Sequence, residues 1–173
     1  MQSIIFIGYR GTGKTTAARQ IAEKLRIPVF DSDVEIEQHA GKSIADIFDQ
    51  DGEPAFRDIE ESVITGILAR PRLLVLATGG GAVLRSGTRE RIRHAGQVIW
   101  LTAAPETILR RITADAASKT MRPHLTSLPM LEEIQTVLEQ RKPLYAETAH
   151  EIINTDFETT DAIVNRVLRL VRI

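Results

Sequence analysis

The chain has 173 residues, a formal net charge of −1, 43% hydrophobic residues and no cysteine. This length and composition are typical of one globular domain with its own core. The balanced charge gives no global field toward nucleic acid or anionic membranes, and the lack of cysteine excludes a disulfide scaffold and thiolate catalysis. No run approaches the ~20 apolar residues of a membrane span, and no signal-peptide pattern is present. We therefore expect a cytoplasmic monomer that binds neither nucleic acid nor membranes.

Strands and helices alternate along the chain. Short apolar runs, most of them rich in Ile and Val, predict buried strands at residues 3–8, 28–30, 73–77, 97–101 and 151–154. Helical patterns lie between them, at residues 14–25, 53–69 and 105–112 and from about Thr160 onward. The last pattern predicts a core-facing stripe formed by Ile163, Val164, Val167, Leu168 and Val171. This alternation predicts a single α/β domain over residues 1–173, with a parallel sheet covered on both faces.

Residues 8–15 read GYRGTGKT and match the phosphate-loop pattern G-x-x-x-x-G-K-[ST] in full. The motif follows an apolar strand and begins a helix, where backbone N–H groups and the positive helix end can face phosphate oxygens. Lys14 is expected to reach the β- and γ-phosphates, and the Thr15 hydroxyl to ligate Mg²⁺. The predicted nucleotide-binding residues of the loop are Gly11, Thr12, Gly13, Lys14, Thr15 and Thr16.

Acidic residues follow the second strand rather than the third. Many phosphate-loop proteins end a later strand in Asp, but here the strand at residues 73–77 is followed by Thr78, and Asp31 and Asp33 follow the strand at 28–30. Ligands of open α/β sheets bind outside the carboxyl ends of the strands, so this pair lies on the same edge as the phosphate loop. The pair can serve a metal and a substrate hydroxyl. Either aspartate could instead be a helix N-cap, because a helical pattern follows.

Three consecutive glycines, Gly79–Gly81, follow the third strand. Such a run costs stability because folding removes its backbone freedom, so we expect something to approach this main chain closely. Arg57, inside an amphipathic helix, and Arg141, near the end of another helix, would complete a receptor for a small anion, most naturally a carboxylate. Taken singly, each arginine fits a surface ion pair better. The combination with exposed glycine amides on the same edge favours a substrate site.

The segment at residues 113–129 fits neither the strand nor the helix pattern. It contains few large apolar side chains, two prolines and a polar centre. Long segments without secondary structure in compact domains are usually functional or disordered, so we expect a mobile lid here.

Together these segments resemble the shikimate kinase family, which comprises small phosphate-loop kinases of the nucleoside monophosphate kinase-like fold. The matching segments run in the family's order over nearly the whole chain: residues 8–16, 30–60, 79–83, 122–123 and 141–145. The resemblance implies a three-layer fold with a five-stranded parallel sheet in the order 2-3-1-4-5. It also implies transfer of the ATP γ-phosphate to the 3-hydroxyl of shikimate, with Mg²⁺, in the chorismate pathway to aromatic amino acids.

The resemblance further implies roles for residues on the nucleotide side. Lys14, Asp33 and Arg122 would be catalytic, with Asp33 holding the reacting hydroxyl and Arg122 moving from the lid onto the phosphates. Arg111 would pack on adenine, and Arg110 is a close competitor for this role.

On the acceptor side, the resemblance places shikimate in the region of about residues 31–61 and against the glycines. Asp33, Arg57, Arg141 and Gly80 would bind it, and Gly79 and Gly81 would shape the same wall. Thr15 and Asp31 would serve the metal.

Two alternatives remain open at this point. The chain could be a related kinase of gluconate or a nucleoside monophosphate, against which the Asp31/Asp33 pair, Arg57 and the triple glycine argue. It could also be a nucleotide-binding module without catalysis, and against this argue four retained residues: Lys14, Thr15, Asp33 and Arg122.

Overall fold

The computed structural model describes residues 2–114 and 129–171, and its centre is a sheet of five parallel strands in the order β2-β3-β1-β4-β5. The strands are β1 (Ser3–Ile7), β2 (Val29–Asp31), β3 (Val75–Ala77), β4 (Gly96–Thr102) and β5 (Glu151–Asn154). The α/β class, the strand order and all the predicted strands are therefore confirmed, with each end within two residues of its predicted position.

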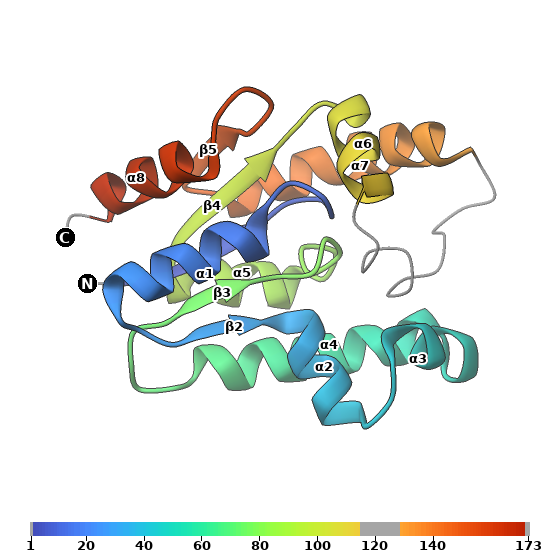
Figure 1. Ribbon diagram of the computed structural model, residues 1–173. Coiled ribbons are helices and arrows are strands. Elements are labelled where there is room, and N and C mark those ends of the chain that lie inside the picture. The colour runs from blue at the N-terminus through green and yellow to red at the C-terminus, as the bar shows by residue number, and fades with distance from the viewer. Residues whose placement is uncertain (1, 115–128, 172–173) are drawn as a thin grey trace.

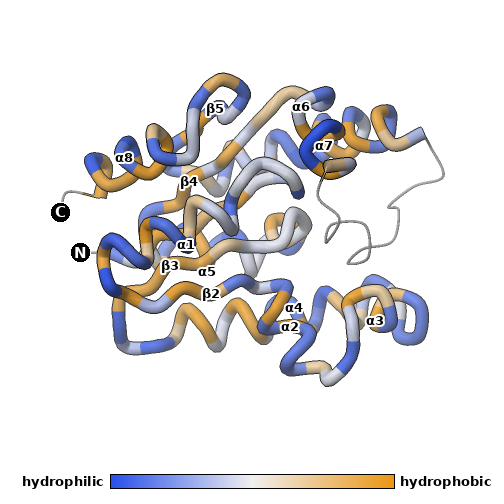
Figure 2. The backbone as a smooth tube through the Cα atoms, viewed as in Figure 1, coloured by the Kyte–Doolittle hydropathy of each residue, from blue (hydrophilic) through white to orange (hydrophobic). Residues whose placement is uncertain are grey.

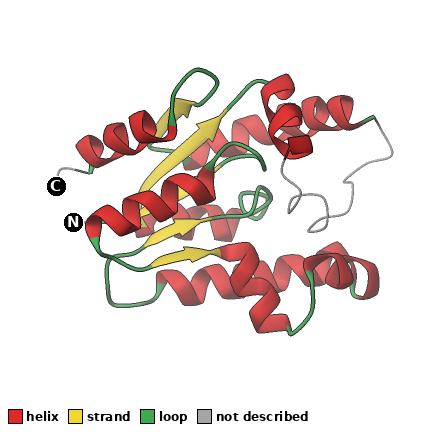
Figure 3. Cartoon of the chain, in the orientation of Figure 1, coloured by secondary structure: helices red, strands yellow, loops and turns green. Residues whose placement is uncertain are grey.

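Helices cover both faces of the sheet, which gives three layers (Figures 1 and 3). Those in the described ranges are α1 (Lys14–Leu25), α2 (Ser32–Ala40), α3 (Ile44–Gln50), α4 (Gly52–Leu68), α5 (Ser86–Ala95), α6 (Pro105–Ala114), α7 (Met130–Thr148) and α8 (Thr160–Leu170). The helices predicted at 14–25, 53–69, 105–112 and from Thr160 are confirmed. Helices α3 and α5 were not predicted. The first is short, and the second buries only Thr88 and Ile92, so its apolar period is faint.

The alternation of side chains along each strand divides the core between the two faces of the sheet. In β1, Ile5 and Ile7 join the cluster under α3, α4 and α5, while Ile4 and Phe6 join the cluster under α1 and α8. Figure 2 shows the hydrophobic strands running through the middle of the molecule. The expected stripe on the last helix is confirmed, since Ile163, Val164 and Val167 are buried and Leu168 and Val171 pack beside them.

Helix α7 continues past Arg141, whereas the sequence suggested that Arg141 lay near a helix end. Pro143 lies inside this helix, which ends at Thr148. Proline removes one helical hydrogen bond, so other contacts must hold the last turns. The Thr148 hydroxyl donates to the Leu144 carbonyl at 2.6 Å, and Arg93 of α5 donates to the carbonyls of residues 147–149 at 3.0–3.3 Å. Arg93 therefore caps the carboxyl end of α7.

The segment expected to form a lid lies largely outside the described residues. Thr113 and Ala114 complete α6, so its first two residues are helical, and residues 115–128, which include Arg122, are not described. Within the described ranges, no helix is long and apolar enough to cross a membrane.

The pairing of β1 with β4 gives a prediction for stability. A Cβ atom at Gly96 would lie 2.7 Å from the carbonyl carbon of Ser3, its partner on β1. Gly96→Ala should therefore lower the free energy of unfolding by about 1–3 kcal/mol through overpacking. Gly66 of α4 is the control, because a Cβ atom there meets nothing within 4 Å. Gly66→Ala should raise the free energy of unfolding by about 0.5–1 kcal/mol. Urea denaturation measures both, and equal effects would contradict the tight β1–β4 packing.

Candidate functional site

The phosphate loop joins β1 to α1 and presents the amino end of that helix. Gly13 precedes the helix in the left-handed region at φ 90°, and no side chain caps the first turn, which also contains no acidic residue. The positive end of the α1 dipole is therefore not compensated locally, which favours an anion there. The buried Lys14 ammonium donates to the carbonyls of Gly8 at 2.8 Å and Tyr9 at 2.7 Å. These two bonds hold the positively charged ammonium group against the main chain of the phosphate loop.

Asp31 connects the end of β2 to the phosphate loop. One carboxylate oxygen accepts a hydrogen bond from the Thr15 hydroxyl at 2.7 Å, and the other accepts from the Asp33 N–H at 3.0 Å. Asp31 is thereby the N-cap of α2, and Asp33 lies in the first turn of that helix. The N-cap alternative is correct for Asp31 and wrong for Asp33. Because a carboxylate has two oxygens, capping leaves Asp31 one oxygen for Thr15.

A pocket of about 320 Å³ opens between these elements at the carboxyl edge of the sheet. The phosphate loop, the start of α2, the glycine run and α6 all contribute to its lining. The lining residues are Arg10, Gly11, Gly13, Lys14, Thr15, Thr16, Asp31, Asp33, Thr78, Gly79, Gly80, Arg111 and Ile112. The structure thus brings together most of the residues that the sequence singled out. Thr12 is an exception, because it is buried and its hydroxyl donates to the Tyr9 carbonyl at 2.8 Å.

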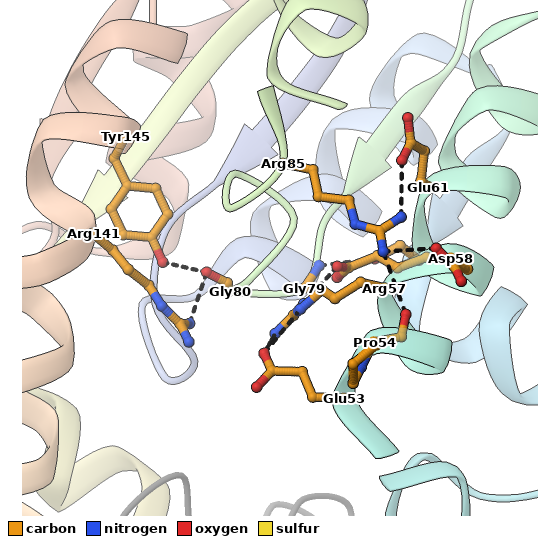
Figure 4. Close-up of polar contacts among 12 residues, drawn as sticks. Glu53, Pro54, Arg57, Asp58, Glu61, Gly79, Gly80, Arg85, Arg141 and Tyr145 are labelled. Carbon is orange, nitrogen blue, oxygen red and sulfur yellow. Dashed lines mark hydrogen bonds and ion pairs between the residues drawn. The ribbon is translucent and has the colours of Figure 1, made fainter. Parts of the chain in front are cut away.

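The glycine run is contacted from three helices, and Figure 4 shows the contacts of Arg141 and Tyr145 with Gly80. The Gly79 N–H donates to the Ser32 hydroxyl of α2 at 2.8 Å, so the expectation of an exposed amide is wrong at this position. The Gly80 carbonyl accepts from Arg141 of α7 at 3.0 Å and from Tyr145 at 2.6 Å.

The third contact explains why Gly81 has no side chain. A Cβ atom on Gly81 would lie 2.6 Å from Cζ of Arg57, so the guanidinium of α4 occupies that space. The group that approaches this main chain closely is therefore an arginine of the protein itself.

Both predicted anion-binding arginines are buried, although Arg57 does form ion pairs with Glu53 and Glu60 of its own helix. Arg57 is 8% exposed and Arg141 is 9% exposed. Glu53 accepts from Nε and Nη2 of Arg57 at 3.2 and 3.0 Å, and Glu60 accepts from its Nη1 at 2.5 Å. The guanidinium also lies 4.9 Å from the centre of the Phe56 ring. These contacts fix the plane of the Arg57 fork, which suits paired hydrogen bonds to a carboxylate. Neither arginine is among the residues that line the 320 Å³ pocket, but both contact the glycine run beside it, Arg141 at Gly80 and Arg57 at Gly81.

Arg111 lies on the opposite side of the pocket, and it is the arginine of the Arg110/Arg111 pair that lines it. It donates to the Gly11 carbonyl at 3.3 Å, the Thr155 hydroxyl at 2.9 Å and the Thr155 carbonyl at 2.7 Å. Arg110 is exposed and is not among the lining residues. Arg111 thus ties the phosphate loop to the segment after β5.

Asp156 anchors the same segment. Its carboxylate accepts from the Ala104 N–H at 2.9 and 3.1 Å. Burial acts to raise the pKa of Asp156, but hydrogen bonds from Ala104, Thr107 and Asn154 and the charge of Arg111 outweigh it and lower that pKa. The segment that carries Thr155 is therefore held in place beside Arg111.

Sequence reasoning missed the residues that support the site. Ser32, Glu60 and Tyr145 each hold a functional group in position, although each lies in or beside a motif already singled out. Glu60 could have been inferred, because it stands three residues after Arg57 and therefore on the same helix face. Ser32 and Tyr145 bond to main chain 47 and 65 residues away, which no local pattern indicates.

The packing of Arg57 on Gly81 can be tested by a double-mutant cycle. Gly81→Ala should lower the free energy of unfolding by about 1–3 kcal/mol, because the added methyl group displaces a buried guanidinium. In an Arg57→Ala background the space is free, and the same change should cost less than about 0.5 kcal/mol. Urea denaturation of the wild type, both single variants and the double variant gives the coupling. The assigned contact would be refuted by equal costs in the two backgrounds.

Comparison with known proteins identifies the family. The shikimate kinase family model matches residues 10–172. The chain is 40% identical over 168 residues to shikimate kinase of Rhodopirellula baltica, covering 97% of this chain and 89% of the relative. It is 44% identical over 155 residues to shikimate kinase of Paracidovorax citrulli, covering 89% and 82%. The solved shikimate kinase of Acinetobacter baumannii in complex with shikimate superposes with a TM-score of 0.91 at 35% identity, covering 99% of this chain and 93% of that one. The chain therefore belongs to the shikimate kinase family.

Proposed function

We propose that this member of the shikimate kinase family transfers the γ-phosphate of ATP to the 3-hydroxyl of shikimate at the pocket described above. The observation that carries the proposal is the closeness of an anion receptor to the phosphate loop. A Cβ atom on Gly80 would lie 3.4 Å from the Gly8 carbonyl oxygen and 3.6 Å from the Arg10 nitrogen. The glycine run that Arg57 and Arg141 contact is thus packed directly on the phosphate loop.

On the nucleotide side, Lys14 and the amino end of α1 would bind the β- and γ-phosphates. Phosphoryl transfer depends mainly on positioning and on neutralising the charge of the transferred group. The Lys14 ammonium would exchange its bonds to the Gly8 and Tyr9 carbonyls for stronger ones to phosphate oxygens. Arg111 would lie against the base, as it lines the pocket beside Gly11. The role of Arg122 on the phosphates stays a prediction, because this residue is outside the described ranges.

Thr15 and Asp31 fit a magnesium ion. Their oxygens lie 2.7 Å apart beside the phosphate loop, and Mg²⁺ typically takes one or two hard protein oxygens together with phosphate and water oxygens. No group of three or more His, Asp or Glu side chains able to hold a metal ion occurs in the described part of the chain, which such a sparse site does not need. Mg²⁺ bound there would neutralise charge on the β- and γ-phosphates. The chain itself would contribute the Thr15 hydroxyl directly and the Asp31 carboxylate beside it.

On the acceptor side, Asp33 would orient the attacking hydroxyl and accept its proton late in the transfer. It lines the pocket from the first turn of α2, next to Asp31. The substrate carboxylate would bind Arg57 and Arg141. Glu53 already accepts two hydrogen bonds from Arg57 and its side chain is 54% exposed, whereas that of Glu60 is 4% exposed. A carboxylate ligand would therefore replace Glu53, while Glu60 keeps the guanidinium in place.

A coupled assay of ADP formation tests the function and the role of Asp33 together. We expect turnover with shikimate and none with gluconate or AMP as acceptor. Asp33→Asn should lower kcat by about 10²- to 10⁴-fold, the usual worth of a positioned proton acceptor, while ATP binding is retained. Turnover with another acceptor alone, or ATP binding without turnover on any acceptor, would refute the proposed function. Near-normal kcat in Asp33→Asn would remove Asp33 from the chemistry.

Arg57 and Arg85 provide a matched pair for the carboxylate site. Both arginines contact acidic side chains of α4, but Arg85 is paired with Asp58 and Glu61 and its side chain is 35% exposed (Figure 4). Arg57→Ala should raise KM for shikimate about 10- to 100-fold, as expected for lost charge-assisted bonds, with KM for ATP nearly unchanged. Arg85→Ala should change neither constant by more than about two-fold. If both variants weakened both substrates alike, the carboxylate assignment would be wrong.

A further inference from the structure

Tyr145 and Arg141 share one acceptor. They stand four residues apart on α7 and therefore on the same face of the helix. The Tyr145 hydroxyl donates to the Gly80 carbonyl oxygen at 2.6 Å, and Nη1 of Arg141 donates to the same oxygen at 3.0 Å (Figure 4). Because a carbonyl oxygen only accepts, the phenol must be protonated to make this bond. Tyr145 is fully buried, with 0% of its surface exposed.

These two donors determine the orientation of a single peptide unit. A carbonyl oxygen has two lone pairs, so Tyr145 and Arg141 together occupy both at Gly80. The neighbouring carbonyls are held locally: Gly79 accepts from the Ala82 N–H at 3.2 Å and Gly81 from the Leu84 N–H at 3.0 Å. Only the Gly80–Gly81 peptide, among these, has its carbonyl bonded by side chains of a distant helix. Since a trans peptide is planar, fixing this carbonyl toward α7 points the Gly81 N–H the opposite way.

The ring of Tyr145 is itself held in place by Trp100 of β4. The two rings stack with centroids 5.4 Å apart and an angle of 28° between their planes, and Trp100 is 7% exposed. This packing helps to aim the hydroxyl at Gly80. Trp100 of the sheet thus supports Tyr145, and Tyr145 in turn supports the main chain at Gly80.

We propose that Tyr145 is a positioning residue for the site that would bind the substrate carboxylate. The sequence motifs assign no such role to Tyr145. Its hydroxyl orients the Gly80–Gly81 peptide and keeps the guanidinium of Arg141 beside it. The substrate named in the test rests on the proposed function, but the orientation of the peptide is a property of the free protein. Tyr145 acts only through Gly80 and Arg141, so its loss should weaken binding of the acid and leave the transfer step intact.

The test compares two variants of α7 that each lose one buried hydroxyl. Tyr145→Phe keeps the aromatic ring and removes the donor to Gly80. Thr148→Val is the control, because the Thr148 hydroxyl donates to the Leu144 carbonyl at 2.6 Å, within the helix rather than to the glycine run. We expect Tyr145→Phe to raise KM for shikimate about 3- to 10-fold, the worth of one neutral hydrogen bond. Its kcat and KM for ATP should change by less than about two-fold, since lost uniform binding raises KM alone.

The outcomes separate this proposal from the proposed function. An unchanged KM for shikimate in Tyr145→Phe, or the same change in Thr148→Val, overturns the positioning role. If the wild type itself fails to use shikimate, the proposed function fails, and amide hydrogen exchange of residues 79–84 then decides. Faster exchange in Tyr145→Phe than in the wild type and in Thr148→Val supports the proposal, and equal exchange in all of these proteins overturns it.

Discussion

The close approach of side chains to the main chain of Gly79–Gly81 is the constraint on which the site depends. Helices α2, α4 and α7 each contact a different glycine through Ser32, Arg57 and the Arg141/Tyr145 pair. A side chain at Gly81 would take the space of the Arg57 guanidinium. The run therefore serves as a thin wall between the phosphate loop and a pair of buried arginines, and its cost in backbone freedom is offset by that closeness.

Three buried cationic side chains lie around this wall: Lys14, Arg57 and Arg141. Charged groups are costly to bury unless they are paired, and here each has acceptors that also fix its direction. Lys14 donates to two loop carbonyls, Arg57 to two carboxylates and Arg141 to the Gly80 carbonyl. Acceptors of the protein itself thus set the direction of each positive group around the glycine run.

The sheet keeps these groups in register. The ends of β1, β2 and β3 lie side by side, with Phe6 and Asp31 both paired to Ala77, so the phosphate loop, the Asp31/Asp33 pair and the glycine run begin at one edge. Strands β1 and β3 are packed on both faces, which makes this edge a rigid support. On the far side of the pocket, Arg111 and Asp156 attach the segment after β5 to the same support.

The sequence by itself determined the α/β class, the strands, the phosphate loop and, through its resemblance to a family, the strand order. These features depend on local patterns: apolar runs, glycine spacing and the residues that follow a strand. It also singled out Asp31, Arg57 and Arg141 by their chemistry. Only the tertiary structure decided what each of these residues contacts.

Three particular cases show why. Asp31 rather than Asp33 caps α2, because the cap depends on where the helix begins to within one residue. Arg111 rather than Arg110 faces the pocket, because neighbouring residues on a helix point about 100° apart and packing selects the face. Gly81 makes room for the guanidinium of Arg57, which lies more than twenty residues earlier in the sequence, and this contact exists only once the chain has folded.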